Sequence, residues 1–451
     1  MATDLLFAYS LDGLSDVYNP SFKSVYVPDQ GVFDPSDTDP YGNGVDNISV
    51  FNGPGDSGGK GPSFYQRSFK GNFVATNKDG IEDGEDITSP LQDLINNVPE
   101  GTAIYFPSGE YTISSKITVS RSVGFFGGIG YRNGAASVDI GGAVLKMADG
   151  ANDDMLLFDG KNTNCLVYGL ALYGNRGNNT SGNGITVENL DTYLTVRDCN
   201  ISHFAENGIA AVNGTTNAAF ITNNAVYYNV NDGIRWAAGA DSIISGNSIG
   251  RNGRDGISVG SANNRIWGNH CWISGRNGIR VSGADNIVGF NRCNNSQKRG
   301  IYVPASERVS VVSNHVDDNG QDTGATNIER AGIVVDGSSD QCIVALNTAS
   351  GGGGAGGTGS QIIGIAIRDT NVTNTLAFGN RATPDHGNAI DVSEAEFGAF
   401  GNTASQQSAL TPANGSTVDG TYGNEERDVI QNNVTRISEI ESALQAYGLL
   451  Q

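Results

Sequence analysis

One short unit repeats nine times between residues 184 and 392, and this repeat constrains the fold more than any other feature. Each unit has a Gly, or once an Ala, followed by Ile and usually by Val two residues later. The units begin at Gly184, Gly208, Gly233, Gly256, Gly278, Gly300, Gly332, Gly364 and Ala389. They are 22–25 residues apart, with two longer steps of 32. A series of asparagines has the same period: Asn200, Asn224, Asn247, Asn269, Asn291, Asn314, Asn347 and Asn380. Two independent markers with one period indicate a genuine structural repeat.

A period near 22 with short β-prone runs and no helical pattern predicts the coils of an all-β solenoid. A single coil cannot bury its own apolar face, so successive coils are expected to stack about 4.8 Å apart, Ile on Ile. The asparagines are expected to form an internal ladder, because an amide both donates and accepts hydrogen bonds. The Gly before each Ile predicts a corner that needs positive φ or close approach of another backbone.

The first coils carry a family resemblance, in residues 79–88, 91–95 and 103–113. These stretches resemble the start of viral tailspikes with a right-handed single-stranded parallel β-helix, in the pectate-lyase-like superfamily. The resemblance covers roughly residues 75–400 and implies a short helix over the first coil. Leu91, Leu94 and Ile95 have the spacing for that helix between Thr88 and Val98. The fold hosts lyases, hydrolases, epimerases and non-catalytic adhesins, so the resemblance implies no single activity.

Three segments follow from these patterns. Residues 1–74 lack the repeat and are rich in Gly, Pro and Asp. They form either an irregular head, which in the resembling spikes joins the virus particle, or an elaborated cap. Residues 75–402 form the β-helix. Residues 403–451 contain a polar linker and a C-terminal helix in which Ile430, Ile437 and Leu444 repeat by seven. That heptad predicts either a clasp of three chains or a helix folded back on the last coil.

The charge balance excludes some partners. The formal net charge is −21, from 48 acidic and 27 basic residues. Such a surface repels nucleic acid and anionic membranes, so neither is expected as a partner. A dense acidic coat with few lysines is typical of proteins that work in high salt, although an ordinary acidic extracellular protein also fits.

Cysteine usage and the ends of the chain bear on compartment and cofactors. The five cysteines, 165, 199, 271, 293 and 342, are expected to be buried free thiols, with a stacked disulfide between Cys271 and Cys293 as the alternative. No metal motif is present, so no cofactor is expected; Ca²⁺ is the one ion that the lyase resemblance allows. The first residues lack a basic stretch and an apolar core, and no 18-residue apolar run occurs. We therefore expect no signal peptide, no membrane span and a location on a virion surface.

A basic region interrupts this acidic chain. Residues 251–330 hold ten Arg or Lys and seven Asp or Glu. Coil stacking predicts one stripe with Arg254, Arg276, Lys298, Arg299 and Arg330, and a second with His270, Arg292 and His315. Guanidinium groups suit carboxylate or sulfate, so the stripes predict an anionic glycan, with simple charge balance as the alternative. Trp267 and Tyr302 are nearby rings for sugar stacking, as are Trp272, Tyr227 and Tyr228, whereas Trp236 is expected in the core.

Catalytic candidates are three carboxylates. Asp232 and Asp255 each precede a corner Gly in adjacent coils, and Glu206 lies one residue further back in the coil before. Paired carboxylates could hydrolyse a glycosidic bond, and like-charge repulsion would raise one pKa. Asp-Gly is also a common turn dipeptide, which is the alternative interpretation. A lyase would instead use Arg or Lys as base, as the pectate-lyase resemblance implies.

The two 32-residue steps place extra residues at one turn of adjacent coils, 319–329 and 349–358. They are expected to protrude side by side as a wall.

Together these features favour a homotrimeric viral spike that binds acidic surface glycan of a salt-loving host. Degradation of that glycan is a further possibility that the sequence leaves open. The alternatives are a free polysaccharide lyase or glycoside hydrolase, and a non-catalytic adhesive or structural β-helix. The sequence leaves open whether the protein is an enzyme.

Overall fold

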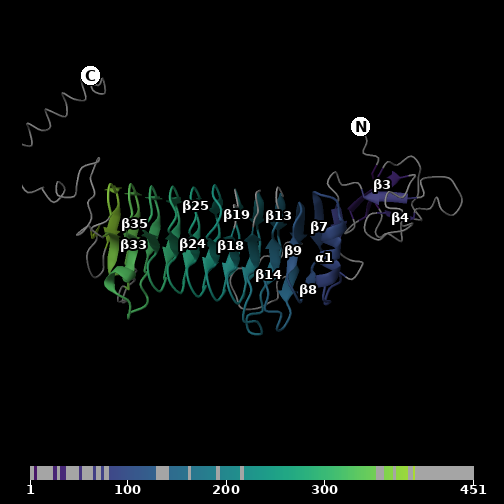
Figure 1. Ribbon diagram of the computed structural model, residues 1–451, viewed down its shortest axis with the longest axis horizontal. Helices are drawn as coiled ribbons and strands as arrows, with labels where there is room; N and C mark the ends of the chain where they lie inside the picture. The colour runs from purple at the N-terminus through teal and green to yellow at the C-terminus, as the bar shows by residue number, and fades with distance from the viewer. Residues whose placement is uncertain are drawn as a thin grey trace, which may run out of the picture.

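The computed structural model describes residues 81–127, 142–160, 164–188, 193–213, 218–351, 360–368 and 372–383, with the backbone of strands in 5–75 and of 390–391. Short coils stack along one long axis, and helix α1, Thr88–Asn97, lies at the end near β7 and β8 (Figure 1). Five strands precede the stack and form a sheet in the order β1-β2-β3-β5-β4. They are β1 Leu5–Phe7, β2 Ser24–Val27, β3 Gly31–Ser36, β4 Val50–Asn52 and β5 Phe64–Arg67.

Three parallel sheets, here called sheets 1, 2 and 3, form the walls of the stack. Sheet 1 contains β6 Phe73–Ala75, β7 Thr102–Phe106, β10 Val123–Gly127, β13 Cys165–Tyr168, β16 Leu194–Arg197, β19 Phe220–Thr222, β22 Ile243–Ser245, β25 Arg265–Trp267, β28 Ile287–Gly289, β31 Ser310–Val312, β34 Ile343–Ala345 and β37 Leu376–Phe378. Each strand pairs with its counterpart one coil away, which confirms the predicted parallel β-helix.

The other two walls follow sheet 1 in every coil. Sheet 2 contains β8 Gly109–Ile113, β11 Ala143–Met147, β14 Ala171–Tyr173, β17 Asn200–Ser202, β20 Ala225–Tyr227, β23 Ser248–Gly250, β26 His270–Trp272, β29 Arg292–Asn294, β32 His315–Asp317, β35 Thr348–Ser350 and β38 Arg381–Thr383. Sheet 3 contains β9 Ile117–Val119, β12 Leu156–Phe158, β15 Ile185–Glu188, β18 Ile209–Asn213, β21 Ile234–Trp236, β24 Ile257–Val259, β27 Ile279–Val281, β30 Ile301–Pro304, β33 Ala331–Asp336, β36 Ile363–Ile367 and β39 Ile390–Asp391.

The repeated Ile forms one column inside sheet 3. The register joins Ile185, Ile209, Ile234, Ile257, Ile279, Ile301, Ile333, Ile365 and Ile390 in successive coils. Ile257 and Val259 of one coil are fully buried, as are Ile279 and Val281 of the next. Trp236 occupies the Val position of its coil and is fully buried, as expected. Stacking of identical apolar positions thus supplies the core that no single coil could bury.

The asparagine ladder is confirmed from Asn224 onward. Its members are Asn224, Asn247, Asn269, Asn291, Asn314, Asn347 and Asn380, and each Nδ2 donates to the Oδ1 of the next at 2.9–3.1 Å. The prediction for Asn200 is wrong. Its backbone pairs with Ala225, and Cys199 stands at the ladder position, donating its N–H to Asn224 Oδ1. An offset of one residue in this coil thus takes Asn200 out of the column.

The corner glycines are explained by close approach. A Cβ on Gly256 would lie 2.6 Å from the carbonyl oxygen of Gly278, and one on Gly278 would lie 2.7 Å from that of Gly300. Neither has positive φ, so of the two predicted reasons only the close approach applies. Any side chain here would push two coils apart.

Helix α1 covers the first coil as expected. Leu91, Leu94 and Ile95 are buried on its inner face, while Asp86 Oδ1 accepts the N–H of Thr88 at 3.0 Å at its start. Apolar side chains that the first coil would expose are therefore covered. Among the described residues, no helix has the length and apolar character to cross a membrane.

Cysteine side chains fill part of the core. All five cysteines are buried and none forms a disulfide, with Cys271 and Cys293 side by side in adjacent coils. This confirms buried thiols over a disulfide. The heptad segment within 403–451 lies outside the described residues, as does most of 1–74, so the clasp and the particle-binding head remain predictions.

Candidate functional site

The turn between sheets 2 and 3 carries most of the first predicted stripe, but Arg299 lies one position further along, in the column of Asp255 and Asn277. Backbone hydrogen bonds of 2.7–3.1 Å link one position from coil to coil, in the order Glu206, Asn231, Arg254, Arg276, Lys298. Arg254 and Arg276 are therefore neighbours, as predicted, and Glu206 stands two coils before Arg254. Arg330 lies beside the end of this column, where its Nε donates to Gly320 O. We call these positions the basic column.

Asp232 and Asp255 lie one position further along, inside the stack. Their column runs through Asp154, Asn183, Asn207, Asp232, Asp255, Asn277 and Arg299. Asp232 Oδ1 accepts the N–H of Asp255 at 2.9 Å, and Asp255 Oδ1 accepts the N–H and Nδ2 of Asn277 at 3.0 and 2.8 Å. The two residues are only 3% and 2% exposed. They replace asparagines in a structural ladder. Their carboxylates therefore accept backbone N–H groups of the next coil, which is a structural role that does not depend on contact with a substrate.

The environment of Asp232 disfavours its ionised form. Burial, and after it the charge of Asp255, raises the pKa of Asp232. The predicted like-charge effect is present but ranks second to burial. Arg276 Nε lies 4.0 Å from Asp255 Oδ1 and offsets the charge of that carboxylate.

Replacing Asp232 with asparagine should stabilise the protein near pH 7. A raised carboxyl pKa means that the stabilising contribution is complete below about pH 4 and is lost as pH rises through the folded-state pKa. An amide avoids that loss, and its Nδ2 could donate to Asn207 as Asn207 donates to Asn183. Denaturant midpoints of Asp232→Asn and the wild type should coincide near pH 4 and separate toward pH 7, with the variant higher.

The control for that comparison is Asp285→Asn. Arg308 beside Asp285 lowers the pKa of this surface carboxyl, so the carboxylate stabilises the folded state above its ordinary pKa. Replacing Asp285 should therefore lower stability near pH 7, the opposite of the effect at Asp232. If Asp232→Asn were instead less stable than the wild type at pH 7, burial would not dominate at Asp232.

Arg299 and Tyr302 form the best candidate for anion binding. The Arg299 guanidinium lies 4.1 Å from the centroid of the Tyr302 ring, and Arg299 is only 8% exposed. Its Nε has no hydrogen-bond partner among the described residues. Burial first, and then the Asp336 carboxylate, raises the pKa of Tyr302, so its hydroxyl stays protonated near neutral pH. The Tyr302 hydroxyl already hydrogen-bonds to Asp336, so the donor suited to bind an anionic oxygen is the unsatisfied Nε–H of Arg299.

The first insertion borders this pair. It ends in a short helix, η3 Asn327–Arg330, and Ile328 packs with Tyr302 against an outer apolar cluster on sheet 3. Ile362, which follows the second insertion, donates its N–H to Arg330 O, so the two insertions meet here. Residues 352–358 of the second lie outside the described chain. The described parts are consistent with the predicted wall beside the site.

Lys298 is already engaged. Its Nζ lies 2.6 Å from Glu329 Oε1 of the insertion, and this contact, together with the N–H of Thr326, lowers the pKa of Glu329 to about 2. The sequence did not indicate this pair, because Glu329 is 31 residues away on a loop of unpredictable path. Lys298 therefore holds the insertion in place and is not available to a ligand in the way that Arg299 is.

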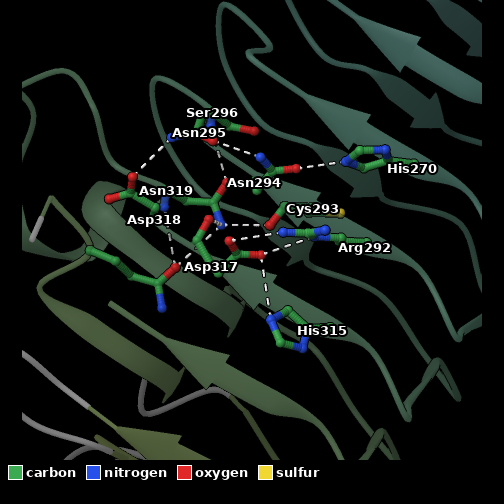
Figure 2. A network of polar contacts seen from close by, with 11 residues as sticks. His270, Arg292, Cys293, Asn294, Asn295, Ser296, His315, Asp317, Asp318 and Asn319 are labelled. Carbon is green, nitrogen blue, oxygen red and sulfur yellow. Dashed lines mark hydrogen bonds and ion pairs between the residues drawn. The ribbon is translucent and has the colours of Figure 1, made fainter. Parts of the chain in front are cut away.

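The second predicted stripe lies on sheet 2 and is confirmed in its geometry. His270, Arg292 and His315 are register neighbours on successive strands. Figure 2 shows Arg292 and His315 converging on Asp317, at 3.4 and 3.5 Å. His270 Nε2 contacts Asn294 Oδ1 at 2.8 Å, and Asn294 continues through Asn295 to Asp318. The Asp317 carboxylate offsets the positive charge of this stripe, as the charge-balance alternative expects. The Arg299 site fits that alternative less well.

A strip of rings and cations beside sheet 2 was only partly anticipated. His203 stacks on Tyr228 at 5.1 Å, and Arg251 lies 5.6 Å from Tyr228 and 5.5 Å from Trp272. Burial, aided by Arg176, lowers the pKa of His203 to about 4, so this ring is neutral near pH 7. Partly exposed ring faces of this kind can stack on sugars. His203, Tyr228 and Arg251 follow their sheet 2 strands directly and all have φ of 54–60°.

The structure separates the other predicted ring from these sites. Trp267 lies on sheet 1, where it contacts Phe290 at 4.5 Å between ring centroids. The predicted ligand residues therefore occupy three faces and cannot form one site. Among the described residues, no group of three or more His, Cys, Asp or Glu could hold a metal ion.

Comparisons with known proteins bear on the fold. A family model described as "Right handed beta helix region" matches residues 183–349. The A-module of mannuronan C-5 epimerase AlgE4 from Azotobacter vinelandii is similar, with TM-score 0.51 at 17% identity over 72% of this chain and 98% of that one. Full-length tailspike protein 2 of an Escherichia coli O157:H7 bacteriophage has TM-score 0.56 at 16% identity, over 82% of this chain and 51% of that one.

The enzymatically active domain of tailspike protein 2 from bacteriophage CBA120 gives TM-score 0.53 at 14% identity, over 82% of this chain and 56% of that one. This chain thus spans about half the length of these tailspikes. No curated protein matches the sequence. At such identities the likeness concerns the fold, and it confirms a right-handed parallel β-helix of the kind found in tailspikes.

Proposed function

We propose that this protein is a spike that binds an anionic glycan through the outer face of sheet 3 and the adjoining turn. The observation that carries the proposal is the buried Arg299 guanidinium, which lies over Tyr302 and whose Nε finds no hydrogen-bond partner in the described part of the chain. Burying a cation is costly unless an anion meets it, so the arrangement favours a negatively charged ligand. The similarity in fold to a tailspike and to a mannuronan epimerase module supports a glycan as that ligand.

Several features make a polymer a better ligand than a small anion. Arg254 and Arg276 repeat at the coil spacing on the same turn as Arg299. The rings of Tyr228 and Trp272, with Arg251 between them, continue along the neighbouring edge of sheet 2. Cations and ring faces repeated along the axis match charged sugars repeated along a chain.

The finer parts of the proposal rest on the sequence. The protein is carried on a virus particle, joined through residues 1–74, and assembles as a trimer clasped by the heptad of Ile430, Ile437 and Leu444. Its acidic coat, −21 overall, fits a salt-loving host. Cleavage by Asp232, Asp255 and Glu206 is a separate proposal, which the burial of the two aspartates in a ladder weakens.

The wild-type protein should bind polyuronate and sulfated polysaccharide but not neutral dextran. We would measure binding to alginate, dextran sulfate and dextran by biolayer interferometry at several salt concentrations. The affinity for the two anionic polymers should fall as salt rises, because screening weakens the guanidinium contacts. Equal binding to dextran, or no binding to either anionic polymer at low salt, would overturn the proposal. Reducing ends and the absorbance of unsaturated uronate, followed in the same samples, report any hydrolase or lyase activity.

A further inference from the structure

The outer face of sheet 1 carries most of the exposed apolar side chains of the described structure. Nine large apolar side chains are exposed, and seven of them lie on sheet 1 or directly beside its strands. Those seven are Tyr193, Trp267, Ile287, Phe290, Ile343, Leu346 and Phe378. We call this set the apolar stripe. The strands of sheet 1 follow one long edge of the solenoid through β7, β13, β19 and β25 (Figure 1), so the stripe runs along the axis.

Two members of the stripe occupy an unfavourable backbone conformation. Phe290 has φ of 54° and Leu346 has φ of 57°, in the column of turn residues that follows sheet 1. Other coils place Gly246, Gly268 and Gly379 at this position, with φ of 62–66°. A bulky side chain there costs roughly 1 kcal/mol. Phe290 contacts Trp267 within the chain, but the side chains of Phe290 and Leu346 are still 56% and 58% exposed, so much of their apolar surface is open to an interaction outside the chain.

Acidic side chains are missing from the two outward rows of sheet 1. One row runs through Ala103, Gly124, Leu166, Thr195, Phe220, Ile243, Arg265, Ile287, Ser310, Ile343 and Leu376. The other runs through Tyr105, Phe126, Tyr168, Arg197, Thr222, Ser245, Trp267, Gly289, Val312, Ala345 and Phe378. Neither row holds an Asp or Glu in a chain with 48 of them. Asp198 lies in the turn column of Phe290 and Leu346, and Asp241, Asp285 and Asp340 precede strands of sheet 1, so carboxylates border these rows without lying in them. Two such acidic molecules would repel less along these rows than along a carboxylate-rich face.

We infer that the apolar stripe is buried against a second copy of this chain, with the long axes of the two solenoids aligned. A glycan is a poorer fit, because Ile287, Ile343 and Leu346 offer branched aliphatic surface and no hydrogen-bonding groups. A second solenoid has the same length of stripe and the same coil spacing of about 4.8 Å, so its ridges stay in register over the whole face. This inference rests on the self-association within the proposed function and names the surface that performs it.

Sedimentation velocity of the full chain over a dilution series tests the inference, with a variant that separates association from folding. In Phe290→Gly with Leu346→Gly, both strained positions receive the residue that suits positive φ, so folding should be preserved. Association should weaken at least tenfold, because two exposed apolar side chains are removed from the stripe. A second variant, Ile287→Glu with Ile343→Glu, places carboxylates on the stripe of every copy and should give monomers.

The matched control is Val230→Glu with Ile273→Glu. Among the described residues, these are the two large exposed apolar side chains away from sheet 1, at 46% and 39% exposure against 36% and 37% for Ile287 and Ile343. The control should associate like the wild type, and circular dichroism should show all variants folded. An oligomeric wild type whose two stripe variants associate unchanged would overturn the choice of face and leave self-association standing. A wild type that is monomeric at every concentration would overturn both, while the polysaccharide assay would still decide glycan binding.

Discussion

Replacing Asn269 with alanine should lower the free energy of unfolding by about 3–5 kcal/mol, since it leaves several buried polar groups without partners. Asn269 Nδ2 donates to Ile244 O at 2.8 Å and to Asn291 Oδ1 at 3.0 Å. Its Oδ1 accepts the N–H and Nδ2 of Asn247 at 3.1 and 2.9 Å. The residue is 1% exposed, so water cannot replace these bonds without opening the coil. Equilibrium unfolding in guanidinium chloride would measure the change.

Two further variants isolate the ladder as the cause. Asn269→Ser should fall between the wild type and alanine, because a hydroxyl can still make part of the network, as Ser242 does when it accepts the N–H of Ala219. Asn96→Ala, on the exposed side of helix α1, should change stability by less than about 0.5 kcal/mol. An Asn269→Ala protein within about 1 kcal/mol of the wild type would show that the ladder is not a main source of stability. Local hydrogen exchange would then show whether adjacent coils open independently, as nearest-neighbour stacking allows.

The sequence predicted the features that repeat with the coil. Ile257 and Ile279, Asn247 and Asn269 each recur at the coil period, and the register places both pairs in contact as expected. Periodicity could do this because a solenoid converts sequence spacing directly into spatial adjacency. Asn200 shows the limit of the method, since a shift of one residue moves a side chain to the opposite face.

What a stacked side chain does depends on its neighbours outside its own column. Asp232 and Asp255 were correctly placed in adjacent coils, but their burial and their bonds to backbone N–H groups were not visible in the spacing. Lys298 was placed correctly as well, yet Glu329 reaches it from an insertion that obeys no period. Arg299 and Tyr302 are three residues apart on either side of a corner. Whether their side chains meet depends on the geometry of that corner, which the spacing does not reveal.

His203, Tyr228 and Arg251 show a signal that could have been found. Each directly follows a strand of sheet 2 and has positive φ, so the three form one outward column. Tyr228 and Arg251 each lie four residues after a ladder asparagine, Asn224 and Asn247, and that offset predicts their alignment. His203 lacks this marker because Cys199 stands in the ladder of its coil. Extending the repeat to every turn position would therefore have found most of the strip.

Replacing Arg276 and Arg299 together with alanine should weaken binding to anionic polysaccharide by about 10–100-fold for each guanidinium removed, from the usual strength of charged hydrogen bonds. The salt dependence of binding should become shallower as well, because fewer ionic interactions remain to be screened. Arg299→Lys should recover only part of the affinity, since an ammonium keeps the charge but lacks the planar fork. Binding of each variant to alginate and dextran sulfate would be measured by biolayer interferometry at low and high salt.

The comparison needs a control that removes the same charge elsewhere. Arg308→Ala with Arg381→Ala also lowers the net charge by two, from exposed positions: Arg308 pairs with Asp285 at the surface, and Arg381 lies at the far end of sheet 2. Exposed ion pairs contribute little to stability, so this control should stay folded. If both double variants bound the polymers equally weakly, binding would reflect overall charge and not the site at Arg299. If the control alone kept wild-type affinity, the ligand must lie at the corner between sheets 2 and 3. Arg276 and Arg299 lie at that corner, whereas Arg308 and Arg381 do not.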